Sequence, residues 1–256
     1  MRYVTGADRA ALLVNPRQSL TSDQESRFLA LVEERSRRRP LQHLVGTQAF
    51  WRHEFRVTPD VLIPRPETEV LVEAALERLR PLGDPTVVDV GTGSGCIALS
   101  LAAEMPRAAV HGVDVSERAL AVARENAARL GLSARVSWHQ GDLLAPVLAL
   151  SGRIDMIVSN PPYVDPADAL SLAPEVRDHE PSLALFPPGD PYSIYRRLVP
   201  DAARVLSPHG WLLLEIGQHM REHVAALCTA AGFEVQAVLP DLQSIPRVVV
   251  ARRTAA

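Results

Sequence analysis

The apolar positions of this chain change their period at two places. Between residues 7 and 45 they recur every three or four positions, which predicts short helices, the main one beginning near Thr21. The apolar face of that helix consists of Phe28, Leu29, Leu31 and Val32. Residues 46–59 alternate apolar and polar side chains instead, which predicts a β-hairpin that turns near His53. The chain therefore opens with a small helical unit followed by a hairpin.

A proline-rich stretch follows the hairpin. In PDVLIPRPETE, Pro59, Pro64 and Pro66 interrupt regular structure, and Pro66 suits the first position of a helix because that position needs no N–H donor. We place the junction between two parts of the molecule here. The predicted organisation is a small helical domain at 1–45, a hairpin and linker at 46–66, and a larger domain at 67–256.

Strand and helix patterns alternate through this larger domain. The predicted strands are TVVDV, AVHGVD, RVSWHQ, IDMIVS, GWLLLEI, FEVQAVL and RVVVAR. Helices are expected after Gly95 and from Ser116 to Leu130. Near-continuous apolar strands alternating with helices predict an α/β fold with a doubly wound, mostly parallel sheet covered on both faces. Only PDLQSIP joins the last two strands, so we expect them to form an antiparallel hairpin at the sheet edge.

Composition limits the classes of protein that fit this pattern. The 256 residues are 47% apolar and carry 27 Lys and Arg against 30 Asp and Glu, a net charge of −3. Such a chain can bury a large core, and it has no overall positive field that would gather nucleic acid. Cys96 and Cys228 lack metal-type spacing and suit reduced thiols. No apolar run is long enough for a signal peptide or a membrane span, so we expect a cytoplasmic protein with no membrane partner.

A glycine-rich turn follows the first strand of the predicted sheet. In VVDVGTGSGCIALSLA, Gly91, Gly93 and Gly95 stand between that strand and a helix. A backbone this bare lets a ligand approach the main chain, and the helix N-terminus offers free N–H groups. The spacing is G-x-G-x-G, with Cys96 where a dinucleotide fingerprint has its third glycine. We interpret the turn as a ligand-binding loop; the alternative is a turn whose glycines serve steric needs only.

Two acidic residues end the next two strands. Asp114 lies 23 positions after Gly91, where a carboxylate can accept both hydroxyls of a ribose. NAD and S-adenosylmethionine share that ribose, so Asp114 alone does not distinguish them. Its other interpretation is an N-cap of the next helix, a role that Ser116 also suits. Asp142 closes the third strand and is either a partner for an adenine amino group or a plain turn residue.

The fourth strand ends in the turn IVSNPPYV at residues 157–164. The side-chain oxygen of Asn160 and the carbonyl of Pro161 can each accept one N–H of a planar NH2 group and hold it while charge develops. Pro162 fixes the turn, and Tyr163 offers a flat face to a substrate. The alternative is a proline-rich turn capped by the Asn side chain. The nearby glycine turn favours catalysis, in which an otherwise poorly nucleophilic amide nitrogen is oriented for methyl transfer.

Five segments together resemble the protein-(glutamine-N5) methyltransferases that act on class I peptide chain release factors. They are LIPRPETE, DVGTGSGCIAL, VSNPPYV, EVRDHEPSLAL and LLLEIG, and the similarity runs from about Ala7 to Arg252. The resemblance implies a small helical N-terminal domain that docks the substrate and a seven-stranded S-adenosylmethionine-dependent methyltransferase domain. It implies methylation of the glutamine side-chain N5 in a Gly-Gly-Gln motif, with S-adenosyl-L-homocysteine as the second product.

The resemblance also implies roles for individual residues. The methionine part of the cofactor would lie against Gly91, Thr92, Gly93, Ser94 and Gly95. Asp114 would bind the ribose, and Asp142 and Leu143 would lie near the adenine. The glutamine carboxamide would be held by Asn160, Pro161, Pro162 and Tyr163, of which Asn160, Pro161 and Tyr163 are the expected catalytic residues. Asn160 would also lie near the methyl group.

The chain departs from the family pattern in three places. Leu143 stands where many members carry an aromatic residue that can stack on adenine. The family has a further helix before the segment matching DRAALLV, so the helical domain here is expected to be short. The stretch FPPGDPYSIY replaces a more glycine-rich turn.

Several further residues and segments have candidate roles. The arginines of ERSRRRP suit a solvated helix end, with a docking patch for protein or RNA as the alternative. The segment Asp165–Asp190 is interpreted as a lid, or else an ordered loop, with Glu180 its best candidate for substrate contact. Arg65 is expected to face the cleft. His219 and His223 lack a third ligand, so no metal site is expected.

Three other functions fit part of this pattern. A glutamine methyltransferase of a ribosomal protein would carry nearly the same motifs. An exocyclic-amino methyltransferase of nucleic acid uses the same turn, but it needs a basic groove or a separate recognition domain. The net charge and length argue against it, so no stable nucleic-acid partner is expected. A cofactor-binding module without catalysis is disfavoured by the intact NPPY turn.

Overall fold

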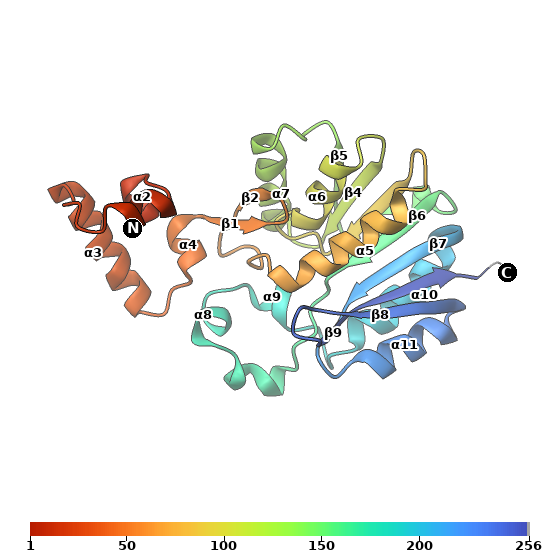
Figure 1. The fold of residues 1–256 in the computed structure, drawn as a ribbon. Helices are drawn as coiled ribbons and strands as arrows, with labels where there is room; N and C mark the ends of the chain where they lie inside the picture. The colour runs from red at the N-terminus through yellow and green to blue at the C-terminus, as the bar shows by residue number, and fades with distance from the viewer. Residues whose placement is uncertain (255–256) are drawn as a thin grey trace.

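A seven-stranded β-sheet forms the centre of the molecule (Figure 1). The computed structural model describes residues 1–254. The strand order across the sheet is β5-β4-β3-β6-β7-β9-β8. The strands are β3 (Thr86–Val90), β4 (Ala109–Asp114), β5 (Val136–Gln140), β6 (Ile154–Ser159), β7 (Leu206–Glu215), β8 (Phe233–Pro240) and β9 (Pro246–Arg253). This order confirms the predicted α/β fold with a mostly parallel sheet.

The last two strands form the expected antiparallel hairpin. The first five strands of the sheet, β3 to β7, run parallel to one another. Strand β9 inserts between β7 and β8 and is antiparallel to both, which leaves β8 at the edge. The last strand of the chain therefore occupies the inner position.

Helices cover both faces of the sheet. Their bounds are α5 (Glu69–Leu79), α6 (Cys96–Glu104), α7 (Glu117–Arg129), α10 (Ser193–Val205) and α11 (Arg221–Ala230), with a short 3-10 helix η2 (Ala145–Leu150). Leu76 of α5 and Leu99 of α6 share one core with Val87 of β3. Val88, the next residue of β3, faces the opposite core with Tyr195 of α10. This alternation is what a strand covered on both sides requires.

The N-terminal helices lie to one side of the sheet domain (Figure 1). They are α1 (Arg2–Thr5), α2 (Arg9–Val14), α3 (Ser22–Ser36) and α4 (Leu41–Val45). Thr21 and Gln24 form a capping box that fixes the start of α3, as the sequence predicts. Every residue of α3 is at least partly exposed, and the predicted apolar face includes the exposed Leu29 and Val32. The short helix α1 was not predicted.

A hairpin and a linker connect the helices to the sheet domain. Strands β1 (Thr47–Phe50) and β2 (His53–Arg56) pair antiparallel, and the turn is made by Trp51 and Arg52, just before the predicted position. The backbone N–H of Trp51 donates to Glu69 at 2.8 Å, which ties the hairpin to the start of α5. Pro66 begins a 3-10 turn, η1 (Pro66–Thr68), that leads into α5, so the predicted helix start is confirmed.

The segment between Asp165 and Asp190 folds into short helical turns. These are η3 (Pro166–Ser171), α8 (Pro174–Arg177) and α9 (Ser182–Leu185). Glu175 of α8 forms ion pairs with Arg35 at 2.6 Å and with Arg38 at 2.8 Å. Two arginines of the cluster at the end of α3 therefore bind this segment and are not simply solvated. Among residues 1–254, no helix has the length and hydropathy needed to cross a membrane.

Gly112 of β4 supports the packing beneath the glycine turn. A Cβ at this position would lie 2.4 Å from the ring of Trp138 and 3.1 Å from the hydroxyl of Thr92. We expect Gly112→Ala to lower the free energy of unfolding by about 1–3 kcal/mol, because overpacking displaces a large ring. Urea unfolding measures this loss. Gly83→Ala is the matched control, since its Cβ would meet only an arginine side chain at 3.7 Å. Equal stability of the two variants would contradict the prediction.

Candidate functional site

A cavity of about 280 Å³ lies at the carboxyl ends of β3, β4 and β6. Ten of the twelve residues assigned from sequence to the cofactor or to the glutamine carboxamide line it: Gly91, Thr92, Gly93, Ser94, Asp114, Asp142, Leu143, Asn160, Pro161 and Pro162. Gly95 and Tyr163 are the two of these twelve that do not line it. The glycine turn, the acidic strand ends and most of the NPPY turn therefore meet at one place.

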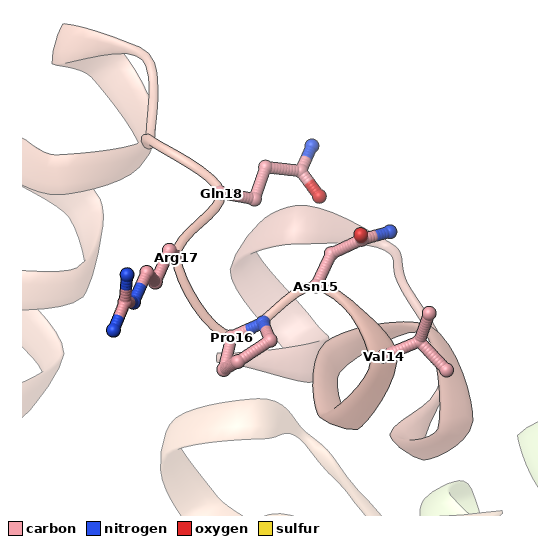
Figure 2. A pocket seen from close by; sticks show the side chains of 5 residues that line it. All are labelled: Val14, Asn15, Pro16, Arg17 and Gln18. Carbon is pink, nitrogen blue, oxygen red and sulfur yellow. The ribbon is translucent and has the colours of Figure 1, made fainter.

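A second hollow lies at the surface near the end of α2 (Figure 2). It is lined only by consecutive residues, Val14 to Gln18, and Figure 2 shows their side chains spread outward from one turn. The volume of this hollow is larger, at about 540 Å³, but its side chains do not converge on a common point. We assign the chemistry to the cavity at the carboxyl ends of the strands.

The glycines of the turn serve two different purposes. All three have positive φ, at 73° for Gly91, 56° for Gly93 and 79° for Gly95. A Cβ at Gly95 would lie 3.0–3.2 Å from three side chains, so this glycine allows helix α6 to pack closely. A Cβ at Gly91 would meet nothing within 4 Å. The backbone at Gly91 and Gly93 is therefore open to a ligand, as a close main-chain approach requires.

A buried carboxylate holds the glycine turn in place. Asp89 of β3 is fully buried, and its Oδ2 accepts the hydroxyl of Thr92 at 2.6 Å and the N–H of Ala98 at 3.2 Å. Burial raises the pKa of Asp89 to about 7. Sequence reasoning treated this residue only as part of a strand. The sequence feature that could have identified Asp89 is an acidic residue within an otherwise apolar strand directly before the glycines.

Asp114 lies on the cavity wall with its carboxylate partly engaged. Its two oxygens accept backbone N–H groups from Gly93 and Ser116, each at 2.9 Å. Burial raises the pKa of Asp114, whereas these bonds favour the charged form. Each oxygen keeps a second lone pair for a ligand hydroxyl. Ser116 is the N-cap of α7, because its side chain accepts the N–H of Ala119, so Asp114 is not needed for that role.

The two residues predicted to lie near the adenine, Asp142 and Leu143, have a charged neighbour that the sequence did not reveal. Asp142 is exposed and forms an ion pair with Arg197 of α10, which also lines the cavity. Leu143 lies beside it with a positive φ of 49°. An apolar side chain next to a charged pair gives this end of the cavity one surface for a ring and another for polar groups.

The NPPY turn begins where β6 leaves the sheet. Ser159 donates its hydroxyl to the carbonyl of Val90 at 2.7 Å, which ties the end of β6 to the end of β3. Asn160 donates its side-chain N–H to the hydroxyl oxygen of Thr68 at 3.2 Å. Pro161 and Pro162 continue along the cavity wall.

The sequence predicted that Tyr163 presents its ring to the substrate, but Tyr163 does not line the cavity. It packs with the core beneath α10, and a Cβ at Gly217 would touch its ring at 3.2 Å. Burial raises the pKa of Tyr163 to about 12. Its side chain packs against the buried residues of the core beneath α10, which include Tyr195 and Met220. The ring supports the turn from behind.

Behind Asn160 lies a polar cluster that the sequence did not reveal. It contains Thr68 and Glu215, both buried, together with the nearby Arg247. Glu215 ends β7, in the motif LLLEIG that contributed to the family resemblance without an assigned role. Burial raises the pKa of Glu215 to about 7, while hydrogen bonds from Thr68 and Asn160 and the charge of Arg247 oppose that rise.

The structure corrects the expectation for Glu180. This residue is 6% exposed and does not face the cavity. It accepts the N–H of Ile63 at 3.1 Å and pairs with Arg65 at 2.6 Å, so it fixes the proline-rich linker. Arg65 itself lines the cavity, as expected. Within residues 1–254, no group of three or more His, Cys, Asp or Glu side chains is placed to hold a metal, and His223 stacks on Tyr192.

Together, this fold and site define an S-adenosylmethionine-dependent methyltransferase. Residues 67–176 match the family description "Methyltransferase small domain", and residues 1–46 match "PrmC N-terminal domain". The chain has 46% identity to a release factor glutamine methyltransferase of Moorella thermoacetica, covering 96% of this chain and 86% of the relative. The corresponding protein of Cereibacter sphaeroides has 45% identity, covering 100% and 90%. The chain belongs to the release factor glutamine methyltransferase family.

Solved structures share the fold at low sequence identity. A methyltransferase from Pyrococcus furiosus aligns with a TM-score of 0.59 and 16% identity, covering 92% of this chain and 100% of that one. The ribosomal protein L11 methylase of Lactobacillus delbrueckii subsp. bulgaricus aligns with a TM-score of 0.57 and 21% identity, covering 81% and 90%. At these identities the likeness concerns the fold alone.

We expect Asp114→Ala to weaken binding of S-adenosylmethionine by about tenfold or more. The reason is that a hydrogen bond to a charged group contributes about 1.5–3 kcal/mol. Isothermal titration calorimetry measures the affinity. Asp155→Ala is the control, since Asp155 also accepts a backbone N–H, from Thr86 at 2.8 Å, but at the opposite end of the strands. Equal affinities of the two variants would remove Asp114 from the cofactor site.

Proposed function

We propose that this chain transfers a methyl group from S-adenosylmethionine to the side-chain amide N5 of the glutamine in the Gly-Gly-Gln motif of class I peptide chain release factors. The observation that carries the proposal is the position of Asn160. Its amide is anchored to Thr68 at the wall of the same cavity that the glycine turn and Asp114 line. The names of the curated relatives support the release factor as the protein substrate.

The residues present fit the cofactor. Open backbone at Gly91 and Gly93 leaves room for its methionine part, and Asp114 has lone pairs for the ribose hydroxyls. Asp142 and Leu143 would flank the adenine. When bound, the cofactor supplies a methyl group on a positively charged sulfur and leaves as neutral S-adenosyl-L-homocysteine.

The acceptor nitrogen needs orientation more than activation by a base. The lone pair of a carboxamide nitrogen is delocalised, so the side-chain oxygen of Asn160 and the carbonyl of Pro161 would each accept one N–H and direct the nitrogen. As the new N–C bond forms and the S–C bond breaks, these two acceptors stabilise positive charge on the nitrogen. One proton then leaves the nitrogen for water. Holding the two reactants together contributes the rest of the acceleration.

The remaining parts of the chain fit a protein substrate. We assign substrate docking to the helical domain at 1–45, with the hairpin and linker at 46–66 connecting it to the methyltransferase domain at 67–256. The segment from Asp165 to Asp190 would border the acceptor. A release factor substrate places the reaction in the cytoplasm.

The substrate assignment is tested with labelled cofactor. The purified chain is incubated with methyl-labelled S-adenosylmethionine and, in parallel, a class I release factor, the same factor with its Gly-Gly-Gln glutamine replaced by alanine, total ribosomal protein, or duplex DNA. We expect label only in the unaltered release factor. Label in ribosomal protein alone would support the ribosomal glutamine methyltransferase, and label in DNA alone would support the nucleic-acid enzyme.

A single substitution tests the role of the turn. We expect Asn160→Ala to lower the rate of transfer by about 10²–10³-fold, because one of two acceptors aimed at developing charge is lost. Cofactor affinity should survive in part, since the glycine turn and Asp114 are unchanged. Single-turnover rates and calorimetry on the same preparation separate the two effects. Normal turnover by the variant would refute the assigned role.

A further inference from the structure

We propose that Glu215 is a positioning residue that, together with Thr68, orients the side-chain amide of Asn160 so that its oxygen faces the cavity. The inference deepens the proposed function and rests on it. Glu215 does not line the cavity, so it acts through Asn160 and not on the substrate.

The geometry places these three side chains together from distant parts of the chain. Ser159, the residue before Asn160, pairs with Leu214, the residue before Glu215, so the two side chains leave neighbouring strands at the same level. Thr68 approaches from η1 and accepts the N–H of Asn160 at 3.2 Å. The carboxyl of Glu215 is close enough to Thr68 and Asn160 that both polar side chains lower its pKa. Thr68 and Glu215 are each only 2% exposed, so little water competes for their polar groups.

Donor and acceptor counting then decides how the amide lies. A carboxylate only accepts, and a hydroxyl that accepts from Asn160 still has its own hydrogen to donate to Glu215. One N–H of Asn160 is used by Thr68, and the Glu215 carboxylate offers an acceptor for the other, an arrangement that leaves the Asn160 oxygen as the free end. That oxygen is the acceptor that the proposed function needs. The second oxygen of Glu215, Oε2, is buried with no hydrogen-bond partner among the described residues.

Protonation of Glu215 would remove this preference. A carboxylic acid can donate, so it can bind the oxygen of a reversed Asn160 amide, which would then turn its NH2 toward the acceptor. Several groups face Glu215: Arg247, Glu67, Tyr163, Tyr195 and Cys96. Burial and Glu67 favour the neutral acid, whereas Arg247, Thr68 and Asn160 favour the carboxylate.

These opposing effects set the sign of the pH dependence. Burial raises the pKa of Glu215 from 4.5 to about 7, so the orienting carboxylate is present above that pH and is lost below it. Methyl transfer should therefore fall as pH decreases through about 7. The amide of the substrate does not titrate in this range and would give no such limb.

Substitution of Glu215 tests the inference through kinetics. We expect Glu215→Gln to lower kcat about tenfold, the effect of losing one ordinary hydrogen bond, and to abolish the acid limb near pH 7. Glu215→Leu offers no acceptor and should lose at least a further tenfold, so partial rescue by Gln marks a positioning role. Cofactor affinity should change in neither. An unchanged acid limb in Glu215→Gln would overturn the inference.

Tyr195→Phe is the matched control for disturbance of the buried cluster. The hydroxyl of Tyr195 donates to the backbone carbonyl of Glu215 at 2.7 Å, so its loss perturbs the same strand end but leaves the carboxyl in place. We expect this variant to be less stable and to keep the acid limb. Loss of the limb in Tyr195→Phe would assign the pH dependence to general loosening of the core.

A measurement without substrate keeps the inference separate from the proposed function. The side-chain amide signals of Asn160 in ¹⁵N–¹H spectra, identified by their absence in Asn160→Asp, should shift with a midpoint near pH 7 in the unaltered protein and stay constant in Glu215→Gln. Shifts that are the same in both proteins would sink the inference. If no release factor is methylated but this titration is seen, the proposed function fails and the positioning of Asn160 stands.

Discussion

The parallel pairing of β3 with both β4 and β6 is the constraint on which the site depends. Val90 at the end of β3 pairs with Val113 on one side and Ser159 on the other, so three chain segments leave the sheet at one level. The glycine turn, Asp114 and Asn160 follow directly from those three strand ends. Backbone N–H groups of Gly91 and Thr92 both donate to the carbonyl of Val113, at 2.8 and 3.0 Å, which holds the turn against β4. The cavity is thus a product of strand register, and a shift of one residue would separate its parts.

Two buried carboxyl groups support this arrangement at a cost in stability. Asp89 holds the glycine turn and Glu215 lies behind Asn160, and burial raises the pKa of each to about 7. Each has one oxygen without a partner in the described part of the chain. An apolar side chain of similar volume would relieve the desolvation, as replacing buried charge often does. Retaining the carboxyls fits a fold in which polar order at the strand ends matters more than the last increment of stability.

The sequence was informative wherever the signal was local. Strands of continuous apolar residues were placed to within a few positions, and the helix starts near Thr21 and at Pro66 were predicted from neighbouring residues. The errors concern contacts between distant residues. Thr68 and Asn160 are 92 positions apart, and Arg65 and Glu180 are 115 apart, so no periodicity links them. The position of Tyr163 has a related cause, because its ring packs against residues distant in sequence, among them Gly217, which the motif does not reveal.

The ion pairs between α3 and α8 connect two regions that the chain order keeps apart. Arg35 and Arg38 are about half exposed, whereas Glu175 lies mostly beneath them, with 16% of its side chain accessible. Pairs of this kind contribute little in salt because solvent and counterions compete for each charge. The end of helix α3 is therefore held to α8 by ion pairs that become weaker as ionic strength rises. Contact between the N-terminal helices and the segment that contains α8 is thus governed in part by the surrounding electrolyte.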